Sequence, residues 1–262
     1  MWELYDKLID EVKEDVIAEE IIVGQTWTLT HSHTIGLAMS SPRPKMSNFI
    51  PGTCHGKTVK ELAKLVKSWD FVEASIGLSA INSAINHIET IKDLQSRGYH
   101  QLPSASAFDL INESVIGKKV TVIGHFPNVD ELSKICQLTV LERNPAFGDL
   151  PDPAAEYLLP EQDFVIMTSS TLINKTAPRL LELSKNAVTI MLGPSTPLSK
   201  TLFEMGVDMI SGLVVEESGP VLRSVKEGGG IHHFQESVHY VNLIRNDSLL
   251  AELKEVKEYE NV

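Results

Sequence analysis

From Val120 onward, short apolar runs rich in β-branched residues alternate with segments of helical pattern. The apolar runs are VTVIG, LTVLE, DFVIMTS, AVTIMLG and MISGLVV, and the segments between them include NVDELSKIC, PRLLELSKN and PLSKTLFEMG. Because these runs are apolar nearly throughout, we expect strands that are buried on both faces. The alternation therefore predicts βαβ units that form a Rossmann-like parallel sheet with helices on both faces.

The first 112 residues follow a different order and predict a smaller α+β domain. After an amphipathic helix come two β-prone runs, IIVGQTWTLT and TIGLAMS, a loop rich in proline and glycine, and further helices. Thr58 and Glu61 form a capping-box pattern at the start of the second helix, and SIGLSAINSAINHIETI predicts the third. The polar segment RGYHQLPSASAF reads as a linker. We expect two domains, at residues 1–112 and 113–262.

Composition narrows the class of protein. With 42% apolar and 22% charged residues, the chain is expected to bury a sizeable core. The net charge of -12 disfavours nucleic acid as a partner, since binding to phosphate backbones needs a clustered basic surface. No apolar run reaches membrane-spanning length and the N-terminus lacks a signal-peptide pattern, so we expect no membrane partner and a cytoplasmic location. Two distant cysteines predict no disulfide framework, and a homo-oligomer stays open.

Polar residues follow each of the expected strands, where open parallel sheets bind their ligands. The stretch TSSTLINKT carries more hydroxyl and amide groups than one helix cap needs, so we interpret the surplus as facing a ligand. Helix capping is the alternative for Thr196, and an ordinary surface carboxylate is the alternative for Glu142. The candidate ligand-binding residues at the strand ends are His125, Glu142, Thr171, Asn174, Gly193, Ser195 and Thr196.

Asn82 and Asn86 lie one turn apart on the same face of the third expected helix. Asparagine is a poor helix former and costs roughly 0.5 kcal/mol relative to alanine. We therefore predict that both amides are kept for hydrogen bonds, either across the domain interface or to a ligand. An ordinary solvated face is the alternative.

Histidine and glutamate raise the question of a metal. His125 and Glu142 are the candidate ligands for a divalent metal at the strand ends. His31 and His33 would share a face of an extended segment, and His232, Glu236 and His239 would line one face of a C-terminal helix. We interpret these two groups as surface histidines, because neither has the HExxH spacing of a zinc hydrolase. The turn GHFPNV has one glycine, so we expect no conventional NAD site.

Three strings, VIGHFP, LTVLERNPAFGDLPDPAAEYLLPEQDFVIMTSSTLINKT and MLGPSTPL, resemble a prokaryotic family described as a heavy-metal chelation domain of unknown function. The resemblance spans residues 115–240, and the GLSAINSAIN helix is similar to the companion N-terminal domain of that family. It implies a Rossmann-like C-terminal domain and an N-terminal domain similar in fold to the small domain of enolase. Enolase activity does not carry over, since the catalytic barrel has no counterpart here. The resemblance also implies a site between the two domains, which would match the candidate residues above.

These observations lead to a binding hypothesis and two alternatives. The chain is expected to bind a small polar ligand, such as a heavy metal or a metal chelate, in an interdomain cleft, with Glu142 as the anion and His125 as the switchable group. If the second and third strands flank the first, Glu142 and residues 169–174 belong to one site. The alternatives are a transferase or lyase that acts on a nucleotide-like or tetrapyrrole-like substrate, and a non-catalytic carrier of a small ligand. Whether the chain is an enzyme stays open.

Overall fold

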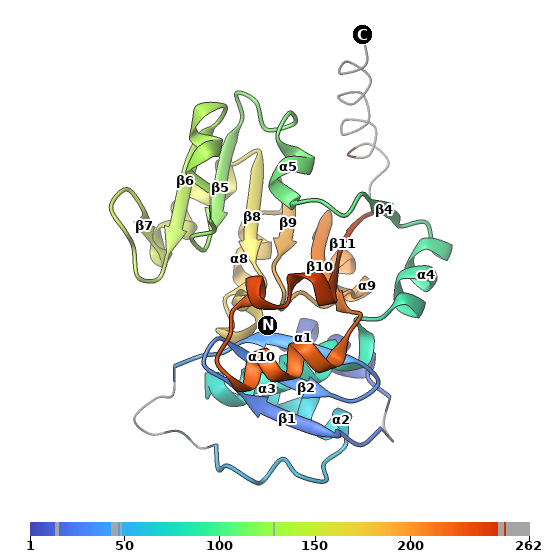
Figure 1. Cartoon of the computed structure of the whole chain (residues 1–262). Coiled ribbons are helices and arrows are strands. Elements are labelled where there is room, and N and C mark those ends of the chain that lie inside the picture. Colours follow the sequence, from blue (N-terminus) through green and yellow to red (C-terminus); the bar gives the residue numbers. More distant parts are fainter. Residues whose placement is uncertain (14–15, 43–46, 48, 128, 246–248, 250–262) are drawn as a thin grey trace.

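The computed structural model describes residues 1–13, 16–42, 47, 49–127, 129–245 and 249. Within these residues a large, mostly parallel sheet is flanked by helices, and a small antiparallel sheet lies below it in the view of Figure 1. The predicted mixed α/β fold is confirmed. The large sheet has the order β4-β11-β10-β9-β8-β5-β6-β7. Its strands are β4 (His100–Leu102), β5 (Lys119–Ile123), β6 (Gln137–Glu142), β7 (Leu150–Pro151), β8 (Phe164–Thr168), β9 (Val188–Leu192), β10 (Met209–Val215) and β11 (Val238–Ile244).

Strand β5 lies between β6 and β8 and runs parallel to both. The predicted flanking arrangement is therefore confirmed. From β5 the chain adds β6 and β7 on one side of the sheet, and it then crosses to the other side to add β8, β9 and β10. The carboxyl ends of these three strands meet at one edge of the sheet. This is the place where open parallel sheets form a crevice.

Helices cover both faces of the large sheet, and alternate strand residues divide between them. Val120 and Val122 of β5 pack on one face with α5 (Ala107–Ile111) and the 3-10 helix η2 (Val129–Lys134). Ile123 packs on the other face, with the helices between β7 and β10. Those helices are α6 (Ala155–Leu158), α7 (Ser170–Ile173), α8 (Ala177–Leu183) and α9 (Lys200–Glu204), with the 3-10 helices η3 (Asp152–Ala154) and η4 (Leu159–Glu161). The predicted α-helix over 128–136 is wrong, because the described part of that segment forms only η2.

The small sheet consists of β1 (Glu20–Val23), β2 (Trp27–His31) and β3 (Ile35–Met39). The predicted run IIVGQTWTLT is two strands, because the chain turns after Gly24, whose N–H donates to the carbonyl oxygen of Trp27 at 3.0 Å. One face packs against α3 (Phe71–Ile85), which follows α2 (Val59–Ala63) and the 3-10 helix η1 (Lys64–Lys67). The other face packs with α10 (Ser218–Lys226), which crosses in front of the sheet in Figure 1. The predicted capping box of Thr58 and Glu61 is present.

Helix α3 is buried on nearly every side, which explains its apolar composition. The predicted helix over 75–91 is divided in two, because α3 ends at Ile85 and α4 (Ile88–Ser96) begins after His87 as its N-cap. Asn86, between them, turns its side chain to the loop after β9 of the large sheet and does not continue the helix. The alternative of a solvated face is wrong, since Asn82 is fully buried.

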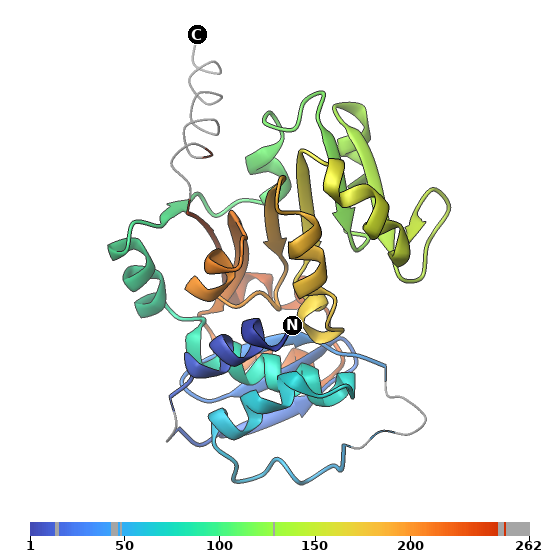
Figure 2. The ribbon, with the colours of Figure 1, turned by 180° about the vertical axis from the view of Figure 1, so that it is seen from behind.

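Helix α1 (Trp2–Asp10) lies between the two sheets and contacts both parts of the chain (Figure 2). The Tyr5 hydroxyl donates to the carbonyl oxygen of Leu172 at 3.0 Å, in a fully buried position. The carboxylate of Glu11 accepts hydrogen bonds from the Ser199 and Thr201 hydroxyls, each at 2.5 Å. The predicted boundary at residue 112 and the likeness to the small domain of enolase stay predictions. Strand β4, which lies before that boundary, pairs with β11.

The C-terminal part of the described chain corrects one expectation. His232 and Glu236 lie in two 3-10 helices, η5 (Ile231–His233) and η6 (Gln235–Ser237), and His239 lies in β11. These residues do not share a helix face, because Gly228 has a positive φ of 80° and the chain then runs into an antiparallel strand. None of the described helices combines the length and apolar composition that a bilayer-spanning helix requires.

Candidate functional site

A small pocket lined by both polar and apolar residues lies at the carboxyl ends of β5, β6 and β8, and we call it the strand-end pocket. Its volume is about 90 Å³. Glu142, Thr171 and Asn174 from the predicted set line it, although they follow two different strands. The other lining residues are Ile123, Gly124, Leu141, Arg143, Asp152, Ala155, Thr168, Thr176 and Leu180. The structure thus brings together the two segments that strand order predicted to be neighbours.

Glu142 holds the ends of two strands together with its carboxylate. Its Oε2 accepts from the backbone N–H of His125 at 3.1 Å, and its Oε1 accepts from the N–H groups of Arg143 and Asn144 at 2.7 and 3.3 Å. These bonds leave lone pairs for a further partner, because a carboxylate has about four acceptor positions. The Arg143 guanidinium does not neutralise this carboxylate directly, since its Nε pairs with Asp152 at 2.9 Å.

His125 is held by a carboxylate of its own. Its Nδ1 lies 3.1 Å from Oδ2 of Asp149, whose side chain is 4% exposed. Asp149 also accepts from the N–H of Ala146 at 2.9 Å, so the loop before β7 is tied to the loop after β5. This arrangement orients the imidazole and leaves Nε2 as the ring nitrogen on the side away from Asp149.

The polar groups after β8 are partly used within their own loop. The Thr171 hydroxyl donates to the carbonyl oxygen of Thr168 at 2.7 Å. Oδ1 of Asn174 accepts from the N–H and the hydroxyl of Thr176, at 3.1 and 2.6 Å. Within the described chain, the Asn174 Nδ2 has no hydrogen-bond partner, and a lone pair of the Thr171 hydroxyl is likewise unassigned. The surplus over capping that the sequence indicated is therefore smaller than the residue count suggested.

Four of the other predicted residues, Asn82, Asn86, Ser195 and Thr196, form an interface, and neither they nor His125 line the strand-end pocket. Nδ2 of Asn82 donates to the carbonyl oxygens of Leu37 and Ser195 at 2.8 and 3.0 Å, and Nδ2 of Asn86 donates to that of Thr196 at 2.9 Å. The Ser195 hydroxyl accepts from the N–H of Met39 at 2.8 Å. The prediction that the two parts of the chain meet through the two asparagines is confirmed. Their role toward a ligand stays a prediction.

Two buried polar atoms at this interface lack a partner in the part of the chain that the structure describes, and Gly193 is the last of the predicted residues to be placed. Oδ1 of Asn82 and the hydroxyl of Thr196 are buried without a hydrogen-bond partner among the described residues. Gly193 has a positive φ of 118°, which lets the chain turn after β9 toward Ser195. The N-cap of α9 is Ser199, so capping does not explain Thr196.

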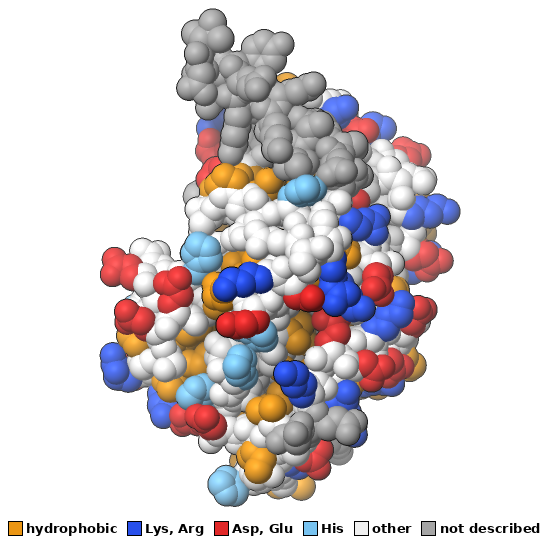
Figure 3. All heavy atoms as spheres, turned by 90° about the vertical axis from the view of Figure 1, so that its right-hand side faces the viewer, with side chains coloured by type: hydrophobic (Ala, Val, Ile, Leu, Met, Phe, Trp, Pro, Cys, Tyr) orange, Lys and Arg blue, Asp and Glu red, His pale blue; other side chains and the backbone are white. Residues whose placement is uncertain are grey.

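A group of side chains that could hold a metal ion includes His33, which we interpreted from the sequence as a surface histidine, and two residues that the sequence analysis did not single out. One ligand atom each of His33, His87 and Glu89 lie within 4.8 Å of one another. They line a cavity of about 960 Å³ beside α4, and Figure 3, which views this side of the molecule, shows histidines among charged side chains of both signs. The available signal was His87 at the start of an amphipathic helix, where serine, threonine, aspartate or asparagine is usual.

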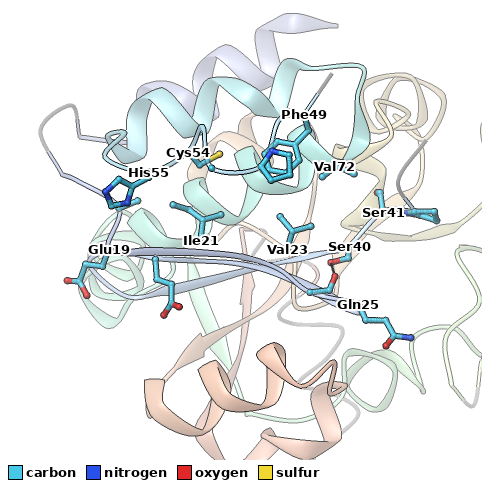
Figure 4. Close-up of a pocket in the computed structure, with 16 residues that line it drawn as sticks. Glu19, Ile21, Val23, Gln25, Ser40, Ser41, Phe49, Cys54, His55 and Val72 are labelled. Atoms are coloured by element: carbon cyan, nitrogen blue, oxygen red, sulfur yellow. Dashed lines mark hydrogen bonds between the residues drawn. The ribbon is translucent and has the colours of Figure 1, made fainter. Parts of the chain in front are cut away.

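A further cavity of about 830 Å³ lies beside β1. Figure 4 shows Ile21 and Val23 pointing toward Phe49 and Cys54 on the facing loop. Burial raises the pKa of the Cys54 thiol, so this side chain stays protonated near neutral pH. The cavity therefore presents an apolar floor and no thiolate ligand.

Comparisons with known proteins agree with the fold. The family model DUF364 matches residues 106–244 and the model DUF4213 matches residues 5–85, and each is described as "Putative heavy-metal chelation". An uncharacterized protein of Methanocaldococcus jannaschii is 30% identical over 155 residues, which cover 56% of this chain and 56% of that protein.

Two solved structures are also similar. A protein of unknown function from the DUF364 family of Desulfitobacterium hafniense is 36% identical, with a TM-score of 0.83 over 94% of this chain and 99% of that one. A DUF364 protein of unknown function from Pyrococcus horikoshii is 21% identical, with a TM-score of 0.77 over 91% of this chain and 97% of that one. At this lower identity the likeness shows a shared fold alone.

Proposed function

This chain belongs to the DUF364 family, and from that membership and the strand-end pocket we propose that it binds a metal ion, free or as a small chelate, at the ends of β5, β6 and β8. The observation that carries the proposal is the meeting of Glu142, Thr171 and Asn174 in one pocket. These groups come from both sides of β5, where the strand order reverses.

The size of the pocket supports an ion or the polar end of a small molecule. Its volume of about 90 Å³ is roughly that of three water molecules, at about 30 Å³ each. A metal ion that keeps part of its water shell fits this space. A whole dinucleotide or tetrapyrrole does not, so only one end of such a molecule would enter.

The donor atoms indicate the class of metal. Glu142 supplies an anionic oxygen, and Thr171 and Asn174 supply neutral polar groups. Oxygen ligands suit hard or borderline divalent ions, of which Mn²⁺ is one, better than soft ions that prefer thiolates. The family description names heavy metals, and among these the pocket suits the harder ions better than the soft ones.

His125 fits the same proposal through its pairing with Asp149. A histidine that binds a metal commonly donates its second N–H to a carboxylate, which fixes the tautomer and the ring orientation. The contact between Nδ1 and Oδ2 of Asp149 at 3.1 Å has this form. His125 does not itself line the pocket, so its Nε2 would reach the ion by a rotation of this exposed side chain.

Calorimetric titration of Mn²⁺ tests this proposal. Glu142→Gln should weaken binding by at least tenfold, because a charged hydrogen bond or ligand contact contributes roughly 1.5 to 3 kcal/mol. His125→Gln should weaken it severalfold, and this partly exposed side chain holds no core contact. Glu161→Gln, an exposed carboxylate outside the pocket, serves as the control. Wild-type affinity in both Glu142→Gln and His125→Gln, with both variants folded, would overturn the proposal.

A further inference from the structure

The side chains of His33, His87 and Glu89 form a second candidate metal centre. None of the three lines the strand-end pocket. We propose that these two imidazoles and one carboxylate bind a single divalent transition metal ion of the Zn²⁺ class. Two histidines and one glutamate are a known ligand set for zinc with an open coordination position.

The fold holds His33 beside His87 through the turn between β2 and β3. The Ser32 hydroxyl donates to the Ser83 hydroxyl at 2.7 Å, and the N–H of Thr34 donates to the carbonyl oxygen of Ser83 at 3.2 Å. Both bonds fasten the turn to the last part of α3. His33 thus projects from a turn that is fixed on either side, close to the residue that starts α4.

His87 is fixed from the other direction. Asn86, the residue before it, is anchored by its side chain to the backbone of Thr196 and Leu198. The Nδ1 atom of His87 accepts from the N–H of Thr90 at 3.3 Å, as an N-cap does. The rings of His33 and His87 meet edge to face with their centroids 4.8 Å apart.

The contact between His87 and Glu89 is not explained by helix capping. Nδ1 of His87 lies 2.9 Å from Oε2 of Glu89 while it also faces the N–H of Thr90. An unprotonated Nδ1 would place its lone pair against a carboxylate oxygen, and a protonated Nδ1 would leave the Thr90 N–H without this acceptor. A separation of 2.9 Å is about 0.5 Å shorter than that of two ligands on a tetrahedral ion with bonds of about 2.1 Å, so the two atoms would move slightly apart on an ion.

To bind an ion, Nδ1 of His87 would give up its hydrogen bond from the N–H of Thr90, because an imidazole nitrogen has one lone pair, and His33 would move closer to the other two ligands. In a tetrahedral site with bonds of about 2.1 Å, ligand atoms lie about 3.4 Å apart, against the 4.8 Å limit that contains the three atoms here. His33 is exposed, so a side-chain rotation can supply this movement. His87 and Glu89, with Nδ1 and Oε2 2.9 Å apart, need only a small shift.

The adjoining cavity has a volume of about 960 Å³ and leaves room for an exchangeable ligand at the open position. Its lining carries charges of both signs, from Glu11, Glu19 and Asp93 and from Lys13 and Lys200.

A neighbouring histidine offers a matched control. Nδ1 of His31 lies 3.2 Å from Oε2 of Glu19, and the two side chains are 25% and 64% exposed. The corresponding exposures are 22% and 72% for His87 and Glu89. The two pairs therefore differ mainly in the presence of a third ligand, His33. An ordinary ion pair predicts equal behaviour of the two, and a metal centre predicts different behaviour.

Titration with Co²⁺, followed by its visible absorption, tests this centre. The wild-type chain should develop the absorption of a low-coordinate Co²⁺ ion that saturates near one equivalent and is displaced by Zn²⁺. His33→Ala and His87→Asn should each weaken this binding at least tenfold, and asparagine retains an N-cap at position 87. His31→Ala should leave it unchanged, and so should Glu142→Gln, which separates this centre from the strand-end pocket.

Two results would overturn the inference. One is wild-type Co²⁺ binding in both His33→Ala and His87→Asn. The other is an equal loss in His31→Ala, which would show that the histidines of this surface bind metal without a defined centre. A far-ultraviolet circular dichroism spectrum of each variant distinguishes loss of binding from loss of fold.

Discussion

The side-chain amide of Asn86 donates a hydrogen bond of 2.9 Å to the carbonyl oxygen of Thr196, from the end of α3 to the loop after β9. The same side chain accepts from the N–H of Leu198 at 2.8 Å. One residue thus ends a buried helix, joins the small sheet with its helices to the large sheet, and positions His87 as the next residue. At this point the connection between the two parts of the chain runs through backbone groups of Thr196 and Leu198, which the Asn86 amide meets with both its donor and its acceptor.

Replacement of this amide should destabilise the protein. Asn86→Ala removes its donors and its acceptor and leaves buried backbone groups of Thr196 and Leu198 unpaired, each at a cost of roughly 1 to 3 kcal/mol. We expect the free energy of unfolding in urea to fall by about 3 kcal/mol. Asn112→Ala, at an exposed asparagine, is the control and should change it by less than about 0.5 kcal/mol. Equal stability of the two variants would mean that this contact does not hold the interface.

A second prediction concerns Gly36 in β3. A Cβ atom at this position would lie 2.1 Å from the carbonyl oxygen of Ser79 and from the N atom of Ser83, so Gly36→Ala forces β3 away from α3. Backbone atoms cannot move aside cheaply, and we expect a loss of more than about 3 kcal/mol or no folded protein. Gly219→Ala in α10 is the matched control, because its Cβ would meet only the flexible Arg223 side chain at 3.4 Å. Chemical denaturation of a well-folded Gly36→Ala with wild-type stability would contradict the close packing.

A third prediction concerns the nearly buried Lys175. Burial lowers the pKa of its ammonium group to about 8, and Nζ donates to the carbonyl oxygen of Ile173 at 2.6 Å. Between that value and the unfolded pKa of about 10.4, the unfolded chain binds more protons, so stability rises with pH. The destabilising effect of the charged form is fully present below pH 8.

Lys175→Met isolates this effect, because the other groups that titrate in the same range are shared with the wild-type chain. From pH 7 to pH 10, the free energy of unfolding of the wild type should rise relative to that of the variant by about 2 to 3 kcal/mol. The rings of Tyr5 and Phe71, with centroids 5.5 and 5.9 Å from Nζ, favour the charged form and would reduce the change. A constant difference across this range would show that Lys175 titrates as an exposed lysine does.

The parallel strands were predictable because their apolar runs are long, β-branched and separated by helical segments. The position of β5 between β6 and β8 followed from the general behaviour of doubly wound sheets. The edge of the sheet was not predictable in the same way, since β4 and β11 pair antiparallel and carry polar residues such as His100 and His239. Local pattern alone does not distinguish such a strand from a loop or a helix face.

Part of the candidate site was likewise predictable from the sequence, and part was not. Strand-end position sufficed to group Glu142 with Thr171 and Asn174, because it depends on topology. The cluster of His33 and His87 was not predictable, since it depends on where α3 ends. That end is set by the contact of Asn86 with residues far along the chain. The sequence predicted a hydrogen bond of Asn86 across the interface, but not that α3 would end before His87 because of it.

Anomalous diffraction from crystals soaked in Mn²⁺ tests the proposed metal-binding function most directly. We predict an anomalous peak in the strand-end pocket, at a bonding distance of about 2.2 Å from an oxygen of Glu142. Its place between the ends of β5, β6 and β8 would show that the reversal in strand order forms the site. Crystals that take up manganese elsewhere on the molecule but show no peak beside Glu142 would contradict the account.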